Sequence, residues 1–210
     1  MQRPVRPRPA ASLILLRQGP GGLEVLLGRR GGGARFMPGR YVFPGGRVQG
    51  FDTRPWSDEA PCAAPAQHAH RRAALRETFE ETGLLIGQTG ACRDCTPATP
   101  VERAYRERGI VPVLDALVPV GRAITPSRSP IRFHGRFFLA DGALALGTPQ
   151  DGDELEDLGW RAVERGLPDM ADVTQFMLKR AVDVRRGADA ARSPLYHYVR
   201  QVPRVSWLAP

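Results

Sequence analysis

The sequence predicts an α/β (α+β) fold, and three patterns support that class. Two β-rich runs, residues 11–17 and 23–30, flank the glycine-rich segment QGPGG and are typical of a hairpin. Helical patterns cover residues 68–83, ending at a glycine suited to a helix C-terminus, and residues 170–186, where apolar residues recur on one face. The aromatic segment IRFHGRFFLAD, residues 131–141, is typical of a strand.

The remaining segments predict shorter elements. Residues 40–48 combine aromatic and β-branched residues with a Pro-Gly-Gly break, which predicts a strand that ends abruptly in a turn. Residues 101–109 predict a short polar helix, and residues 111–120 fit either a helix or a strand. The acidic stretch DGDELEDLGW precedes a helix expected around residues 163–166.

Length and composition favour one domain. The 210 residues are expected to form a flexible basic tail at 1–10 and a single domain at 11–210, with a proline-rich insertion loop at about 53–67. No apolar run approaches the roughly 18 to 20 residues that a membrane helix needs, so no membrane partner is expected. An odd number of cysteines, three in all, suits a reducing compartment, and the expected location is the cytoplasm.

The chain carries a formal net charge of +8, and Lys179 is its only lysine. The arginines are scattered with few interleaved aromatic residues, which indicates a solvated surface rather than a nucleic-acid groove. A positive potential still attracts anionic ligands. Small molecules that bear phosphate groups are therefore the favoured partners.

Three carboxylates crowd one face of the first predicted helix. Glu77, Glu80 and Glu81 lie within about a third of its circumference, whereas Leu75 and Phe79 point to the opposite side. Like charges at this spacing cost a few tenths of a kcal/mol each, and the C-terminal half of a helix disfavours anions. The pattern is consistent with a solvated acidic face, or with a site for Mg²⁺ or Mn²⁺, which carboxylates bind.

The neighbouring residues resemble a known family. RETFEETG, Arg76 to Gly83, matches the core of the Nudix box, and FPGG, Phe43 to Gly46, precedes it as in that family. The resemblance implies an α/β/α sandwich with a mixed central sheet. It also implies an Mg²⁺- or Mn²⁺-dependent hydrolase that cleaves a diphosphate bond in a nucleoside diphosphate linked to another moiety. Family members are commonly dimers, so a homodimer is expected.

The resemblance also assigns roles to residues of the box. Glu77, Glu80 and Glu81 would bind the divalent cation, and Glu77 would help to activate the attacking water. The backbone carbonyl of Gly45 would complete the metal site. Arg76 would orient the nearby carboxylates.

The box departs from the family pattern because an insertion separates Asp52 from Arg76. Asp52 stands where the family has a glutamate, and Glu59 is an alternative acid for the same place. Such an interruption is similar to the coenzyme A diphosphatase-like branch, and ITPSRSPIRFHGRFFLAD resembles a segment of that branch. This resemblance implies coenzyme A or its acyl derivatives as substrates.

Two further groups of charged residues are candidates for the site. The family often uses an acid from a distant loop as base or extra ligand, and DELED offers Glu154 and Glu156; a solvated turn is the alternative. Arg29, Arg30 and Arg47 lie around the glycine-rich segments and are candidates for binding substrate phosphates. For each arginine, a solvated surface position is the alternative.

Cys92 and Cys95 form a C-x-x-C pair that, with Cys62, His68 or His70, would make a zinc site. Ordinary reduced thiols are the favoured interpretation, because the spacing is only half of a zinc motif. His134, on a predicted strand beside aromatic residues, is expected to be structural.

Two other functions are compatible with the sequence. One is a non-catalytic sensor that keeps the fold and binds a nucleotide, although an intact set of costly glutamates counts against it. The other is a basic nucleic-acid-binding protein, including a hydrolase of RNA ends, whose binding would depend on salt.

Overall fold

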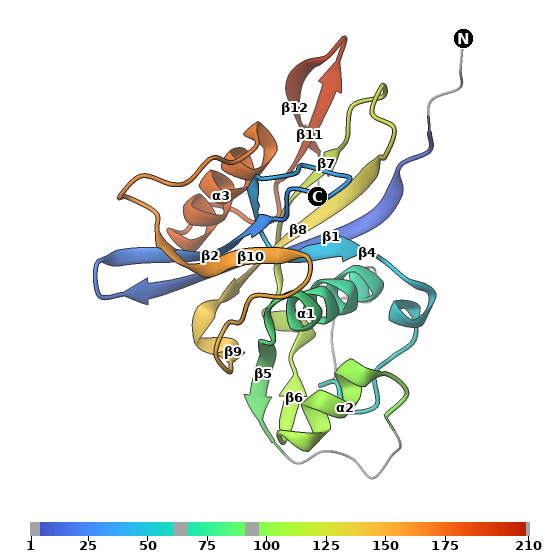
Figure 1. The fold of residues 1–210 in the computed structure, drawn as a ribbon, viewed down its shortest axis with the longest axis vertical. Coiled ribbons are helices and arrows are strands. Elements are labelled where there is room, and N and C mark those ends of the chain that lie inside the picture. The colour runs from blue at the N-terminus through green and yellow to red at the C-terminus, as the bar shows by residue number, and fades with distance from the viewer. Residues whose placement is uncertain (1–4, 61–66, 91–96, 209–210) are drawn as a thin grey trace.

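The computed structural model describes residues 5–60, 67–90 and 97–208. Among these residues a nine-stranded mixed sheet lies between helix α1 (His68–Thr82) and helix α3 (Asp172–Arg185), which confirms the predicted sandwich (Figure 1). The strands of this sheet are β1 (Arg8–Gly19), β2 (Gly22–Arg30), β3 (Tyr41–Val42), β4 (Gly45–Arg47), β7 (Val118–Ile124), β8 (Phe133–Asp141), β10 (Leu155–Ala162), β11 (Ser193–Val199) and β12 (Val202–Leu208).

The long strand β1 is the centre of the sheet. It runs antiparallel to β2 and β4 along one edge and parallel to β8 along the other. Beyond β8 follow β7, β11 and β12, whereas β10 lies outside β2. A second, three-stranded sheet, β6 (Ile110–Pro112), β5 (Leu85–Thr89) and β9 (Ala145–Leu146), lies below α1 beside α2 (Pro100–Glu107).

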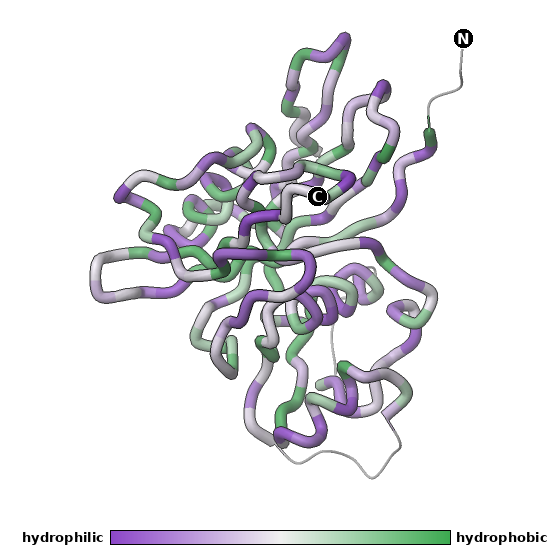
Figure 2. The backbone as a smooth tube through the Cα atoms, viewed as in Figure 1, coloured by the Kyte–Doolittle hydropathy of each residue, from purple (hydrophilic) through white to green (hydrophobic). Residues whose placement is uncertain are grey.

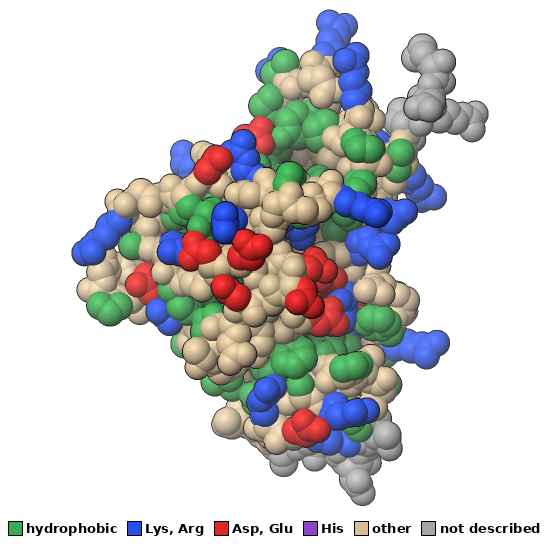
Figure 3. All heavy atoms as spheres, in the orientation of Figure 1, with side chains coloured by type: hydrophobic (Ala, Val, Ile, Leu, Met, Phe, Trp, Pro, Cys, Tyr) green, Lys and Arg blue, Asp and Glu red, His purple; other side chains and the backbone are tan. Residues whose placement is uncertain are grey.

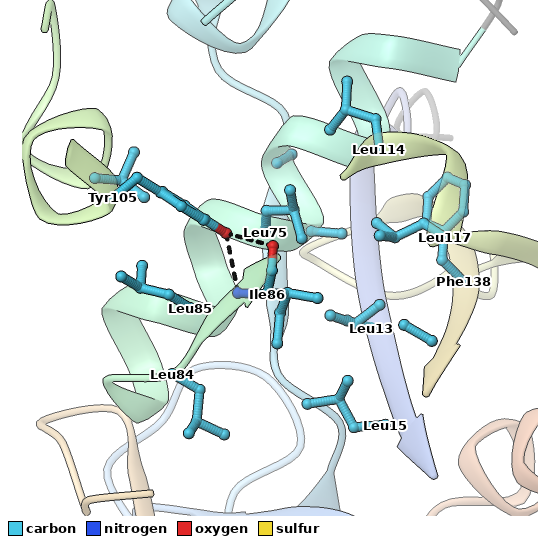
Figure 4. Close-up of a cluster of buried hydrophobic side chains, with 14 of the residues drawn as sticks. Leu13, Leu15, Leu75, Leu84, Leu85, Ile86, Tyr105, Leu114, Leu117 and Phe138 are labelled. Atoms are coloured by element: carbon cyan, nitrogen blue, oxygen red, sulfur yellow. Dashed lines mark hydrogen bonds between the residues drawn. The ribbon is translucent and has the colours of Figure 1, made fainter. Parts of the chain in front are cut away.

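Alternation along β1 divides the core into two layers. Leu13 and Leu15 face α1 and pack in one cluster with Leu75 and Phe138 (Figure 4). The intervening Ile14, with its own neighbours, packs on the side of α3. Successive side chains of a strand point to opposite faces, so one apolar strand serves both layers. Figure 2 shows the apolar segments along the central strands and many polar ones in the outer loops.

Most predicted elements are present. The first hairpin, the helices at 68–83, 101–109 and 170–186 and the strand at 131–141 are confirmed within a few residues. Helix α1 ends at Gly83, which adopts the left-handed conformation with φ 74° and donates its backbone N–H to the Phe79 carbonyl.

Three expectations differ from the structure, and the structure also resolves one segment that was left open between helix and strand. The strand at 40–48 is split into β3 and β4. Residues 8–10 of the expected tail belong to β1, since it pairs there with β4 and β8. The ambiguous segment at 111–120 holds parts of two strands joined by a 3-10 turn. The prediction of a helix around residues 163–166 is wrong, because these residues form a turn after β10.

Candidate active site

Helix α1 carries the three predicted carboxylates to the edge of β4. Glu81 is only 4% exposed, and one of its oxygens, Oε2, accepts a hydrogen bond of 2.8 Å from the Gly45 backbone N–H. The other oxygen, Oε1, is buried and has no hydrogen-bond partner among the described residues. Helix α1 therefore presents to the turn at Gly45 and Gly46, called the glycine turn below, a buried carboxylate with only one of its two oxygens hydrogen-bonded.

Glycine is needed in this turn because other groups approach it closely. A Cβ atom on Gly46 would lie 2.5 Å from the carboxyl carbon of Glu77. A Cβ atom on Gly45 would lie 2.4 Å from the backbone oxygen of Ala11. A methyl group on Gly45 would collide with backbone atoms, whereas one on Gly46 would displace the Glu77 carboxylate, so the two glycines let the backbone lie against the carboxylate face.

Arg76 is the anchor of the site. It is 1% exposed and donates two hydrogen bonds of 3.1 Å to the carboxylate of Asp52, which is fully buried. A further bond of 2.9 Å reaches the backbone oxygen of Arg47. Its Nη1 lies 2.6 Å from a carboxylate oxygen of Glu80 and 2.9 Å from one of Glu77. Arg76 thus fixes two of the three glutamates and the turn that faces them.

The structure distinguishes the two acids that the insertion left as alternatives. Asp52 pairs with Arg76, as described above. Glu59 instead pairs with Arg72, one helical turn earlier, through bonds of 2.7 and 2.6 Å. Asp52 therefore occupies the position beside the glutamates, and Glu59 fastens the insertion to the start of α1.

Burial determines the electrostatics of the carboxylates. It raises the pKa of Glu81 to about 8, against the opposing effect of the Gly45 hydrogen bond. Burial also raises the pKa of Glu77, although Arg76 counteracts it. Each of these groups lies in an environment that disfavours its charged form, which is the electrostatic situation that a bound cation reverses.

The carboxylate oxygens of Glu77, Glu80 and Glu81 are of the type that binds a divalent cation, although their side chains are not arranged around a common point. Within the described ranges, no three His, Cys, Asp or Glu side chains converge on a common point at metal-binding distance. Glu80 is turned toward Arg76, whereas Glu77 and Glu81 lie against Gly46 and Gly45. Carboxylate oxygens with water are the ligands of Mg²⁺ and Mn²⁺, so the residues fit the group.

Of the two candidate acids near β10, only Glu154 lies beside this site. Arg30 Nη2 is 3.8 Å from Glu81 Oε1 and 3.8 Å from Glu154 Oε2, and Glu154 is 68% exposed. Glu156 instead forms an exposed ion pair of 2.9 Å with Arg29. Figure 3 shows acidic side chains gathered on the face where α1 and β10 lie.

The three candidate arginines have separate positions. Arg30 is the one whose guanidinium lies near the carboxylates, whereas Arg29 is held by Glu156. The side chain of Arg47 is exposed, and its backbone oxygen accepts from Arg76. Cys62, Cys92 and Cys95 lie outside the described residues, so the zinc alternative stays a prediction.

A cavity of about 370 Å³ opens beside the glycine turn, on the α3 side of the sheet. Gly45, Gly46 and Arg30 form its edge toward the carboxylates. Its other lining residues are mostly apolar or aromatic, including Phe36, Phe43, Phe133, Phe137, Tyr196 and Tyr198. The two tyrosines come from β11, which the sequence analysis did not predict. Their hydroxyl groups both donate to Asp172, at the start of α3.

No helix among the described residues combines the length and apolar character required to span a membrane.

Comparisons with known proteins identify the family of the chain. The family model described as NUDIX domain matches residues 6–179. Nudix hydrolase 7 of Caenorhabditis elegans is 33% identical over 144 residues, which cover 63% of this chain and only 43% of that protein. The chain thus spans less than half the length of this relative.

Solved structures share the fold. A NUDIX hydrolase from Alicyclobacillus acidocaldarius has a TM-score of 0.63 and 30% identity, covering 85% of this chain and 92% of its own. A MutT NUDIX hydrolase from Burkholderia pseudomallei has a TM-score of 0.52 and 18% identity, covering 84% and 98%. With the family model matching most of its length, this chain belongs to the Nudix family.

Proposed function

We propose that this chain hydrolyses a diphosphate bond in a nucleoside diphosphate linked to another moiety, with Mg²⁺ or Mn²⁺ as cofactor. The observation that carries the proposal is Glu81, a buried carboxylate beside Glu77 with one oxygen that no hydrogen bond satisfies. An uncompensated buried charge is costly, and a divalent cation supplies the compensation. Glu77, Glu80, Glu81 and the Gly45 carbonyl would hold it.

A bound cation would neutralise the diphosphate and lower the pKa of an attacking water. The chain's own residues position the reactants. Arg76 holds Glu77 and Glu80 in place, and Arg30 brings a positive charge to the edge of the cavity for a substrate phosphate. Glu154, exposed beside Arg30, is the proposed acceptor of the proton that the water loses.

The proposed substrates are coenzyme A and its acyl derivatives. The cavity beside the site supports a substrate with an apolar portion, because its described lining includes six aromatic rings and no carboxylate or side-chain amide. Side-chain amides and carboxylates are among the groups that distinguish nucleobases by hydrogen bonds to their edges. An acyl or similar apolar group fits this lining better than a base that must be distinguished from others.

Substrate identity is tested by measuring hydrolysis with and without Mg²⁺ or Mn²⁺. The panel is coenzyme A, an acyl-coenzyme A, NADH, ADP-ribose, diadenosine polyphosphates and nucleoside triphosphates. The expected result is metal-dependent release of phosphopantetheine, or its acyl form, and an adenosine diphosphate product, identified by mass. Preference for another compound would replace the substrate, and binding without turnover of any compound would favour the sensor.

The proposed setting is the cytoplasm, and the proposed assembly is a homodimer. Exposed apolar side chains on β12, Val202, Val205 and Trp207, support a protein contact at that edge of the sheet. Light scattering of the wild type and of Trp207→Glu tests the assembly, since a charge at this position would reduce the dimer population.

A further inference from the structure

Four basic side chains gather on the α1 side of the sheet, apart from the carboxylate site. Arg136 of β8 and Arg122 of β7 are direct cross-strand partners. His134 precedes Arg136 by two residues and therefore points to the same face, the one on which Phe138 packs under α1. His70, in the first turn of α1, is within electrostatic reach of both Arg136 and His134.

Like charges directly opposite each other in a sheet are destabilising. The guanidinium groups of Arg122 and Arg136 form no hydrogen bond or ion pair with any residue that the structure describes. The Nε2 atom of His134 is buried and also lacks a partner within that part of the chain. Of the residues outside the described ranges, only Asp94 is acidic. The four residues thus form a half-buried basic cluster that no carboxylate of the described ranges contacts.

The directions of the pKa shifts agree with this placement of the basic side chains. Burial, and then Arg122, lowers the pKa of Arg136. Burial, followed by both arginines, lowers the pKa of His134. Burial, followed by Arg136 and His134, lowers the pKa of His70 to about 4. No acidic group among the described residues contributes to any of these shifts, so within that part of the chain no carboxylate compensates the positive potential of the cluster.

We propose that Arg122, His134, Arg136 and His70 form a binding site for a phosphate-type oxyanion. Guanidinium groups bind such anions through charge-assisted hydrogen bonds, often two per arginine. The unpartnered ring nitrogen of His134 adds a further polar contact. An anion at this place converts the repulsion between the two arginines into attraction by a shared ligand.

The site is separate from the reaction centre but lies on the same face of the sheet. Gly46, Ala11, Arg136 and Arg122 are successive partners across β4, β1, β8 and β7. Because neighbouring strands are about 4.8 Å apart, the Arg136 backbone lies about 10 Å from Gly46. The ligand is therefore a second phosphate group of the substrate, or a free phosphate that binds independently of it.

Binding is measured without turnover, so the result does not depend on the proposed function. The probe is inorganic phosphate in EDTA, compared with potassium chloride at equal ionic strength, and the readout is the melting temperature. We expect phosphate to raise it in the wild type and in Arg103→Gln, an exposed control with the same change of charge. Arg136→Gln and Arg122→Gln should lose this shift.

The same variants separate ligand binding from a structural role. Without phosphate, Arg136→Gln should melt at or above the wild-type temperature, because it removes a repulsive pair. The proposal is overturned if phosphate stabilises the wild type and Arg136→Gln equally, if it does not stabilise the wild type, or if Arg136→Gln melts well below the wild type without phosphate.

The KM values for two substrates identify the source of the anion. This kinetic experiment is the only part of the test that rests on the proposed function. If Arg136→Gln raises KM for coenzyme A but not for dephospho-coenzyme A, which lacks the terminal phosphomonoester, the substrate supplies the phosphate. If KM for both is unchanged while phosphate binding is lost, the ligand is a free phosphate. Both results support the site.

Discussion

Replacing Arg76 with glutamine tests whether the buried pair with Asp52 holds the site together. The variant removes both hydrogen bonds to Asp52 and leaves a fully buried carboxylate without its cation. Breaking a buried ion pair from one side costs about 3 to 5 kcal/mol. For a chain of this size each kcal/mol corresponds to a fall in melting temperature of about 2 to 4 °C.

The assay is urea denaturation followed by tryptophan fluorescence, with the free energy of unfolding obtained from the midpoint and slope. Arg29→Gln is the matched control, because its ion pair with Glu156 is exposed and such pairs contribute about 0 to 1 kcal/mol. The double variant with Asp52→Asn should be less destabilised than the sum of the two single variants, by about 0.5 to 3 kcal/mol.

Two results would refute this reasoning. One is a loss of less than about 1 kcal/mol in Arg76→Gln, as at an exposed pair. The other is strict additivity with Asp52→Asn, which would show that the two residues do not act on each other and that Asp52 has no role in anchoring the box.

Three further predictions follow from the site. Glu154→Gln should lower kcat by about 10²- to 10⁴-fold, the contribution of a general base, whereas Glu156→Gln should stay close to wild type; equal effects would contradict the assignment. Gly46→Ala should reduce hydrolysis by about 10²-fold, since its methyl group displaces the carboxylate that it faces, and Gly50→Ala, with open space around it, is the control in the same rate assay. Burial raises the pKa of Glu81 to about 8, so the folded protein holds this proton more tightly than the unfolded chain. In EDTA the free energy of unfolding should therefore fall as the pH rises from about 4 to about 8, and urea midpoints should show a shallower fall in Glu81→Gln; an unchanged pH dependence would exclude the effect.

The helix that carries the three glutamates could be predicted from the sequence, because the residues that define it are close together in the chain. The spacing of Glu77, Glu80 and Glu81 places them on one face of any helix, and Gly83 is a local signal for its end. The match to FPGG added the turn that faces this helix. No structure was needed to propose that the two segments meet.

The acid that pairs with Arg76 could not be predicted, because the insertion separates the two in sequence. Asp52 and Glu59 are both acidic, and both precede α1 in the chain, Asp52 just before the insertion loop and Glu59 within it. Only the path of the chain shows that Asp52 reaches Arg76 whereas Glu59 reaches Arg72. Similarly, Glu154 and Glu156 were equivalent in sequence, and pairing of β10 with β2 directs Glu156 to Arg29.

The aromatic wall of the cavity was missed for a related reason. Tyr196 and Tyr198 lie in a C-terminal hairpin that gains its place through pairing with β7, which is distant in sequence. The start of β10 was also not predicted, because residues 151–157 are mostly acidic and acidic residues are uncommon in strands. Long-range pairing overrides local propensity in such strands, and the signal that the sequence offers for them is the alternation of residues along the last 20 positions.

The metal site on α1 is tested most directly by the rate of coenzyme A hydrolysis as a function of Mn²⁺ concentration, in the wild type and in the double variant Glu80→Gln, Glu81→Gln. We expect saturable dependence on Mn²⁺ in the wild type and near-complete loss of turnover in a double variant that remains folded. If the wild type hydrolyses the diphosphate equally well in EDTA, or if the double variant keeps wild-type turnover, the carboxylate face of α1 is not the metal site.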